Sequence, residues 1–177
     1  FSGPRGTGKT STAKVFANTV NCLEPKKGEK CGRCAICKLK ENVDVIEIDA
    51  ASNNGVDEIR EIRQNAKLMP ANSKYKVYII DEVHMLSIGA FNALLKTLEE
   101  PPAHVIFILA TTEFQKIPLT ILSRCQKFQF KKLTNEDIIT KLNEIVKNEN
   151  IKLENGSIEL ISELSDGGLR DAINLLD

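Results

Sequence analysis

The apolar positions of the chain follow two alternating periodicities. Short runs rich in β-branched residues predict four strands, over Val43–Ile48, Lys76–Ile80, Val105–Ala110 and Gln126–Phe130. The two middle runs are almost continuously apolar, which is typical of strands buried on both faces of a parallel sheet. Because helical patterns lie between these runs, the sequence predicts an α/β fold.

Two stripes of apolar residues at helical spacing predict helices between the strands. They consist of Val56, Ile59, Ile62 and Ala66, and of Ile88, Phe91, Leu94, Leu95 and Leu98. We expect the second helix to end before Pro101-Pro102, because proline cannot continue a helix.

Only helical patterns follow Lys131. Thr134 and Asp137 form a candidate capping box, and two apolar faces follow, separated from a third helix by Gly167-Gly168. The faces consist of Ile138, Ile139, Leu142, Ile145 and Val146, and of Ile158, Ile161 and Leu164. We therefore expect an α/β core over residues 1–131 and a helical appendage over 132–177. The chain begins without Met and ends within a helical pattern, so we expect a fragment of a longer protein whose appendage is truncated.

The composition argues against several classes of protein. The chain has 177 residues, of which 42% are hydrophobic and 27% charged, so it can build an apolar core without disulfides. With 24 basic and 24 acidic residues its net charge is zero, which argues against a protein that coats nucleic acid but leaves a local basic face open. The longest apolar run, Val105–Ala110, is far too short for a membrane span, so we expect no membrane partner.

A glycine-rich segment carries the strongest chemical signal. Residues 3–10, Gly-Pro-Arg-Gly-Thr-Gly-Lys-Thr, match the phosphate loop of nucleotide-binding proteins in full. Glycines let backbone N–H groups turn toward a phosphate, Lys9 can reach the β- and γ-phosphates, and the Thr10 hydroxyl can bind Mg²⁺. The alternative is a glycine-rich turn that merely caps a helix. The candidate nucleotide-binding residues are Gly3, Gly6, Thr7, Gly8, Lys9, Thr10 and Ser11.

An acidic pair follows the second predicted strand. Asp81 can hold the Mg²⁺ and its water shell, and Glu82 can act as the general base for an attacking water. Acids are also common where a strand simply meets its loop. Together with the phosphate loop, however, Glu82 favours a hydrolase, because a kinase needs a site for an acceptor hydroxyl.

Four of the five cysteines lie close together in the sequence. Cys22, Cys31, Cys34 and Cys37 have the spacing C-x₈-C-x₂-C-x₂-C, which can surround one metal ion tetrahedrally. Basic neighbours favour the thiolates; they are Lys26, Lys27, Lys30, Arg33 and Lys38. We expect a structural zinc site, with an iron–sulfur cluster or disulfides as the alternatives. The fifth, Cys125, is expected to start the fourth strand as a small buried residue.

Further motifs join these into a series that resembles a known family. The series resembles the gamma/tau subunit family of the bacterial DNA polymerase III clamp loader, which belongs to the AAA+ ATPases, and the resemblance covers essentially the whole chain. Beyond the phosphate loop and the cysteines, it rests on Ile48-Asp49-Ala50-Ala51-Ser52-Asn53, Asp81-Glu82-Val83-His84-Met85-Leu86, the run 92–102, Leu109-Ala110-Thr111-Thr112 and Ser123-Arg124-Cys125.

The resemblance implies roles for matching residues. Thr112 is similar to the sensor-1 residue, which reads the γ-phosphate or the attacking water, with Thr111 as the alternative one position earlier. Arg124 is similar to the arginine finger that acts on the nucleotide of the adjacent subunit, and Arg170 to sensor 2 in the helical lid. Spacing alone does not reject a surface or salt-bridged arginine at position 124, and without the resemblance Arg170 would be a solvated helix residue. His84 and His104 are expected to be structural or loop residues.

The resemblance also implies a function. The expected protein binds ATP, Mg²⁺ and zinc, hydrolyses ATP, and loads the sliding clamp onto primer–template DNA within a ring of clamp-loader subunits of the polymerase holoenzyme in the bacterial cytoplasm. The alternatives are a non-catalytic scaffold subunit of the same assembly, another AAA+ machine such as a helicase motor, and a phosphotransferase, which would need a small-molecule acceptor.

Overall fold

The centre of the molecule is a parallel sheet. The structure, a computed structural model, describes residues 1–177. Strands β1 (Val45–Asp49), β2 (Lys76–Asp81) and β3 (Val105–Leu109) pair in the order β1-β2-β3, and Val77 lies opposite both Val45 and Ile106. Every residue of β2 except Asp81 is buried, which confirms a strand covered on both faces.

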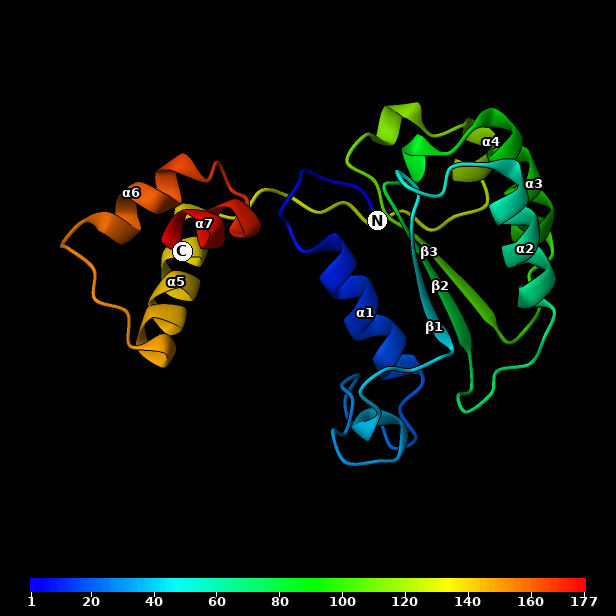
Figure 1. Cartoon of the computed structure of the whole chain (residues 1–177), viewed down its shortest axis with the longest axis horizontal. Helices are drawn as coiled ribbons and strands as arrows, with labels where there is room; N and C mark the ends of the chain where they lie inside the picture. The colour runs from blue at the N-terminus through cyan, green and yellow to red at the C-terminus, as the bar shows by residue number, and fades with distance from the viewer.

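Helices cover the two faces of the sheet unequally. Helix α1 (Lys9–Val20) lies alone on one face, while α2 (Val56–Ala66) and α3 (Ile88–Glu99) cover the other (Figure 1). Side chains of β2 alternate between the two cores, because successive residues of a strand point to opposite faces. On the α1 side, Ala13 and Ala17 pack with Val77, Ile79 and Ile108; on the other side, Tyr78 and Ile80 pack with Ile59, Ile62, Ala90, Phe91 and Leu94.

The fourth predicted strand is wrong. The segment Gln126–Phe130 forms no regular strand, and its backbone hydrogen bonds all go to Ser2, which donates to the Phe128 carbonyl at 2.9 Å and accepts from the Phe130 amide at 2.7 Å. A ladder needs several paired residues, and here one residue does the pairing. Cys125 accordingly starts no strand; it lies half-buried in the turn after the short helix α4 (Leu119–Leu122).

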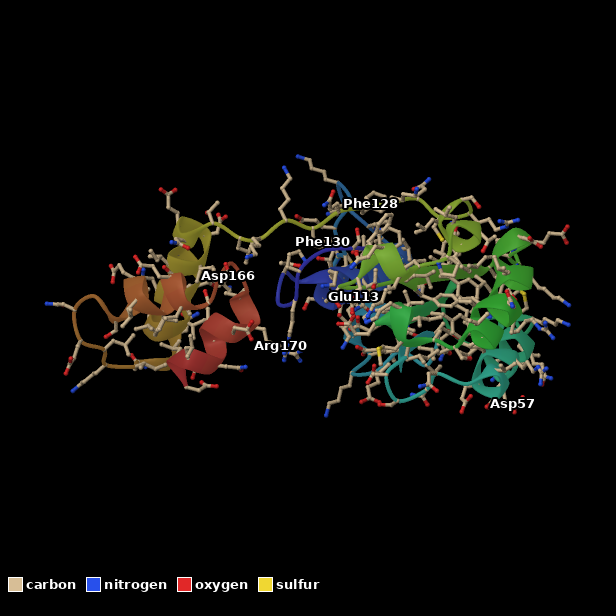
Figure 2. The ribbon with its side chains drawn as sticks, turned by 90° about the horizontal axis from the view of Figure 1, so that it is seen from above. Asp57, Glu113, Phe128, Phe130, Asp166 and Arg170 are labelled. Atoms are coloured by element: carbon tan, nitrogen blue, oxygen red, sulfur yellow. The ribbon has the colours of Figure 1, made fainter.

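The C-terminal segment forms three helices that lie beside the sheet region (Figures 1 and 2). Helices α5 (Asn135–Glu149), α6 (Ser157–Leu164) and α7 (Leu169–Leu176) share a small core. The fully buried side chains of that core are Ile138, Leu142, Ala172 and Leu176. The capping box of Thr134 and Asp137 is confirmed.

The predicted apolar stripes are wrong at some of their positions. Ile88 is 83% exposed and Leu164 is also exposed, because each lies at the end of its helix, beyond the packed turns. Three single-turn 3₁₀ helices complete the chain: η1 (Ile36–Lys38), η2 (Val83–Met85) and η3 (Phe114–Lys116). None of the helices combines the length and the apolar character that crossing a membrane would require.

Candidate functional site

The phosphate loop joins the edge of the sheet to the first turn of α1. Gly8 precedes α1 with a φ of 88°, a left-handed conformation that favours glycine, and it offers no side chain to cap the helix. The first amides of α1 therefore remain available to an anion. Gly3 also needs to be glycine, because a Cβ there would collide with the Phe130 carbonyl.

Lys9 lies inside the loop. Its buried side chain donates from Nζ to the carbonyl oxygens of Gly3, at 2.9 Å, and Pro4, at 2.7 Å. Burial lowers the pKa of Lys9, and the negative charges of Glu82 and Asp81 oppose that shift. The loop therefore already holds the cationic group that would meet a phosphate. Thr7 closes the same turn by donating to the Pro4 carbonyl at 2.8 Å.

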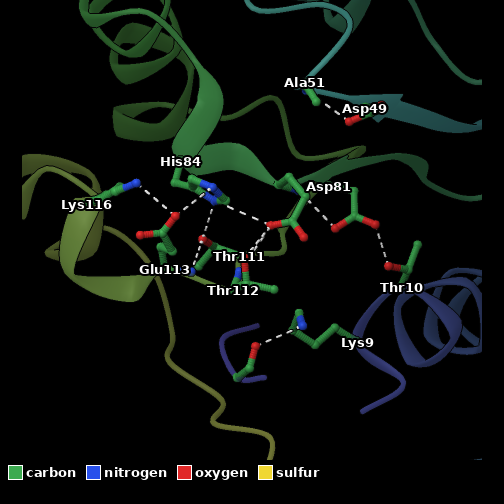
Figure 3. A network of polar contacts seen from close by, with 12 residues as sticks. Lys9, Thr10, Asp49, Ala51, Asp81, His84, Thr111, Thr112, Glu113 and Lys116 are labelled. Carbon is green, nitrogen blue, oxygen red and sulfur yellow. Dashed lines mark hydrogen bonds and ion pairs between the residues drawn. The ribbon is translucent and has the colours of Figure 1, made fainter. Parts of the chain in front are cut away.

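Oxygen ligands suited to Mg²⁺ meet beside the loop. The Thr10 hydroxyl donates to Asp81 Oδ2 at 2.5 Å, so the helix start and the carboxyl end of β2 are in contact (Figure 3). Hydroxyl and carboxylate oxygens fit this hard cation. Ser11, one residue further along α1, is exposed to solvent.

Glu82 turns away from the strand that precedes it. Its backbone is left-handed, with φ 45° and ψ 44°, a conformation that costs a non-glycine residue about 1–3 kcal/mol and is characteristic of functional sites. Its carboxylate reaches the tip of β3, where Oε2 accepts from the Thr112 amide at 3.2 Å and the Thr112 hydroxyl at 2.9 Å. Thr112, and not Thr111, is therefore the threonine that contacts Glu82.

His84 is a member of this cluster that the sequence analysis missed. Its side chain is only 7% exposed, and Nδ1 lies 3.0 Å from the Thr111 hydroxyl and 3.3 Å from Glu82 Oε2 (Figure 3). Nε2 lies 3.4 Å from Glu113 Oε1. The available signal was weak: a histidine two residues after Glu82, which η2 folds back onto the site.

Glu113 joins the site from the loop after β3. Its carboxylate pairs with Lys116 at 2.8 Å, and this hydrogen bond, together with the nearby positive charge of Lys116, holds the pKa of Glu113 below its usual value. Its amide donates to the Thr111 hydroxyl at 3.0 Å. His104, in contrast, lies at the other end of the sheet, where Nε2 is 3.0 Å from the Ala66 carbonyl, as expected for a structural residue.

The side chains of the two predicted arginines make no hydrogen bond to the phosphate loop. Arg124 is exposed and donates to Glu99 at 2.7 Å and to the Thr120 carbonyl at 2.7 Å. Arg170 is exposed at the start of α7, on the side of the three C-terminal helices that faces the sheet region (Figure 2). The backbone beside it does reach the loop, because the Leu169 amide donates to the Gly6 carbonyl at 3.1 Å.

The four clustered cysteines converge in space at the other end of α1. The sulfur atoms of Cys22, Cys31, Cys34 and Cys37 all lie within 4.8 Å of one another, and those of Cys22 and Cys34 are 4.0 Å apart. Four thiolates around one zinc ion would be spaced about 3.8 Å apart, so the set fits a tetrahedral metal site. All four are free thiols, which removes the disulfide alternative for this structure.

Backbone groups prepare the sulfur atoms for a metal. Amides of Cys31, Cys34 and Cys37 donate to the sulfur of the preceding cysteine at 3.2, 3.3 and 3.4 Å. Backbone N–H groups, including that of Leu23, lower the pKa of Cys34 to about 6, while burial and the Cys34 sulfur raise that of Cys37 to about 12. The same donor set also suits an iron–sulfur cluster.

Comparison with known proteins places this arrangement in a class. The structure resembles the Holliday junction branch migration motor RuvB of Thermotoga maritima, with a TM-score of 0.68, 18% identity and coverage of 98% of this chain and 50% of that one. A gamma subunit-related protein of DNA polymerase III from the same organism gives a TM-score of 0.56 at 20% identity, over 95% of this chain and 57% of that one. The fold and the phosphate loop together define an α/β protein of the P-loop nucleotide-binding class.

Sequence comparison identifies the family. Residues 1–134 match the family described as DNA polymerase III, delta subunit, and residues 137–177 match the ATPase lid domain of a DNA polymerase III clamp loader subunit. The chain therefore belongs to the DNA polymerase III clamp-loader subunits. It is 64% identical to the tau subunit of Bacillus subtilis and 49% identical to that of Escherichia coli K12, in each case over the whole chain. It spans 32% and 28% of the length of these two relatives.

Proposed function

We propose that this chain is the ATP-hydrolysing region of a clamp-loader subunit that couples ATP binding and hydrolysis to loading the sliding clamp on primed DNA. The observation that carries the proposal is the meeting of Lys9, Thr10, Asp81, Glu82 and Thr112 at the carboxyl edge of the sheet. A loop for phosphates, oxygen ligands for Mg²⁺ and a carboxylate base are the parts that nucleotide hydrolysis requires.

Each residue has a distinct proposed part in hydrolysis. Lys9 and the amides of the phosphate loop bind the phosphates of ATP. Thr10 and Asp81 would hold Mg²⁺, which supplies charge neutralisation at the phosphate oxygens when bound. Glu82 accepts the proton of the attacking water, and Thr112 orients the Glu82 carboxylate through its amide and hydroxyl.

Two further residues are proposed to act between units. Arg124 is exposed, as a finger that reaches the nucleotide of a neighbouring subunit must be, and such arginines accelerate GTP hydrolysis about 10³- to 10⁵-fold. Arg170 is assigned to the lid over residues 132–177, which faces the phosphate loop of the core over residues 1–131. The partners would be other clamp-loader subunits in a ring, the clamp and primer–template DNA, in the bacterial cytoplasm as part of the replisome.

We also assign a structural zinc ion to Cys22, Cys31, Cys34 and Cys37. Four protein thiolates leave no open coordination position, so the ion would have no catalytic role. The residues of the module over 22–37 bury little apolar surface, which leaves the metal as the main source of its order.

A non-catalytic scaffold subunit is the second candidate. The match of residues 1–134 to a delta-subunit family favours it, because such a subunit would donate Arg124 and hydrolyse nothing. The complete set of Lys9, Thr10, Asp81 and Glu82 favours the ATPase instead, since a scaffold has no use for a base beside a phosphate loop.

Two substitutions in the full-length protein test the proposal. Titration with ATP–Mg²⁺ is expected to show tight binding that Lys9→Ala abolishes, whereas Lys14→Ala, on the exposed side of α1, leaves it unchanged. Glu82→Gln in the assembled complex is expected to lower hydrolysis by about 10²- to 10⁴-fold while ATP binding persists. Its matched control is Glu58→Gln on the exposed face of α2. Hydrolysis that survives Glu82→Gln would overturn the assignment of the base.

A further inference from the structure

The buried imidazole of His84 lies between two carboxylates. Nδ1 faces Glu82 Oε2 at 3.3 Å, and Nε2, on the opposite side of the ring, faces Glu113 Oε1 at 3.4 Å. The Thr111 hydroxyl lies 3.0 Å from Nδ1. A polar ring that is 93% removed from solvent needs such partners, because an unsatisfied buried nitrogen is costly.

The donor and acceptor groups of the imidazole limit how the ring can contact its neighbours. A neutral imidazole has one N–H donor and one lone pair, so it can either direct Nδ1–H toward Glu82, or accept from the Thr111 hydroxyl at Nδ1 and direct Nε2–H toward Glu113. In either form the ring lies between the acid after β2 and the acid in the loop after β3, with Nδ1 beside Glu82 Oε2.

The contacts of Glu82 show why this position of the ring matters. The amide and hydroxyl of Thr112 and the ring of His84 all approach the same carboxylate oxygen, Oε2. Oε1 makes no hydrogen bond within the chain and is left to accept one from water. Holding one oxygen of a base from several sides fixes the direction of the other.

We propose that His84 is a positioning residue for ATP hydrolysis, which holds the Glu82 carboxylate at the tip of β3 so that Oε1 faces the attacking water. This inference rests on the proposed function, in which Glu82 is the base. Glu113 supports the ring from its far side and is itself held by Lys116.

Substitutions at His84 in the full-length protein, assembled with its partner subunits, test the inference. His84→Phe keeps the ring shape but removes both nitrogens, and we expect kcat to fall about 10- to 100-fold, the range for losing an orienting partner. The Kd for ATP–Mg²⁺ should stay within about twofold, since His84 makes no hydrogen bond or ion pair with a residue of the phosphate loop. His84→Asn restores a short donor near Oε2 and should recover part of kcat. His104→Phe, the matched control at the far end of the sheet, should leave kcat unchanged.

The outcomes separate this inference from the proposed function. If Glu82→Gln abolishes hydrolysis and His84→Phe leaves kcat unchanged, the positioning role is overturned and the base assignment stands. If Glu82→Gln leaves hydrolysis intact, the proposed function itself fails. A parallel loss of ATP affinity and kcat in His84→Phe, without recovery in His84→Asn, would show a merely structural role and overturn the inference.

Glu113 provides a second test that does not depend on the stability of His84→Phe. Glu113→Gln should lower kcat severalfold while His84 is present, and should have no further effect in the His84→Asn background, because asparagine does not reach Glu113. Such non-additivity is expected of residues that act through one another. Independent effects of the two substitutions would contradict the positioning role.

Discussion

The two ends of α1 carry two sites that are ordered in different ways. Its N-terminal end continues the phosphate loop and lies against the sheet, while its C-terminal end leads into the cysteine module of residues 22–37, which hangs below the sheet (Figure 1). Near the loop, Ala13 and Ala17 are fully buried against Val77 and Ile79. In the module, only Cys22 and Ile36 are buried.

One short helix therefore connects two regions that are stabilised by different interactions. The phosphate loop is held in place by the apolar core beneath it. Burying apolar surface stabilises the folded state by about 25 cal/mol for each Å² removed from water. The module has too little apolar surface for that, and under the proposed function a metal held by its four cysteines orders it. The two regions should therefore respond to different perturbations, and the following predictions test that separation.

The largest expected effect is the loss of the metal. Chelation, or Cys34→Ser, should disorder the module, because metal binding contributes about 10–16 kcal/mol to the folding of comparable zinc peptides. Metal analysis should show the bound ion lost, and hydrogen exchange should rise over residues 22–40 but not over β2. Cys125→Ser, outside the cluster, should keep the metal. Unchanged metal content in Cys34→Ser would contradict the four-thiolate site.

The reciprocal change weakens the sheet and spares the module. Ile79→Ala removes a fully buried side chain between β2 and α1 and should lower the free energy of unfolding by about 2–5 kcal/mol. Ile88→Ala, at a position 83% exposed, should change it by less than about 0.5 kcal/mol. Denaturant unfolding measures both, and equal effects at the two positions would show that burial does not set the stability of the sheet. The metal content should be unaffected in either variant.

Much of this organisation was predictable, because it rests on local patterns. Each of three features can be recognised from a pattern within about a dozen residues: the apolar run of β2, the apolar stripe of α2 and the phosphate loop. The cysteine cluster is local too, since its four sulfur atoms come from a segment of 16 residues. Such features need no knowledge of distant partners.

The errors concern features that depend on distant partners. Gln126–Phe130 has a strand-like pattern, but whether it forms a strand depends on the length of backbone that pairs with it, and only Ser2 does so. His84 has no motif of its own. Its partners Thr111 and Glu113 lie 27 and 29 residues away and meet it only because β2 and β3 are parallel neighbours.

Asp44 lies where the chain passes from the cysteine module into β1, and a third kind of interaction stabilises the fold there. The residue is 1% exposed, and its carboxylate accepts hydrogen bonds from the amides of Ala71, Asn72 and Ser73 at 2.7, 2.8 and 2.8 Å. Burial opposes ionisation, but these hydrogen bonds prevail and lower the pKa of Asp44. Asp44→Asn should therefore lower the free energy of unfolding at pH 7 by about 1–3 kcal/mol.

The pH dependence of that loss follows from the direction of the shift. A carboxyl whose pKa is lower in the folded state stabilises fully above its unfolded pKa of about 3.9, and the contribution disappears as the pH falls through the folded value. The difference between Asp44→Asn and the unsubstituted protein should thus be large at pH 7 and shrink in strong acid. Asp57→Asn, at an exposed aspartate, should change the free energy of unfolding by less than about 1 kcal/mol, because its only partner is the exposed Arg60. A difference independent of pH would contradict the ionised, hydrogen-bonded carboxylate.

The smallest expected effect concerns the C-terminal helices. They combine a small apolar core with a capped first helix, α5. The Thr134 hydroxyl oxygen accepts the Asp137 amide at 3.2 Å, while Asp137 Oδ2 accepts the Thr134 hydroxyl at 2.7 Å and the Thr134 amide at 3.2 Å. The two hydrogen bonds to Oδ2 hold the pKa of Asp137 below its usual value. Thr134→Ala should destabilise α5 by about 1 kcal/mol, seen as faster hydrogen exchange in its first turns. Thr140→Ala is the matched control within α5, where an exposed threonine donates only to the Glu136 carbonyl. Because alanine has the higher helix propensity, that control should leave exchange unchanged or slow it slightly. Equal acceleration in both variants would mean that the small apolar core, and not the cap, limits the opening of α5.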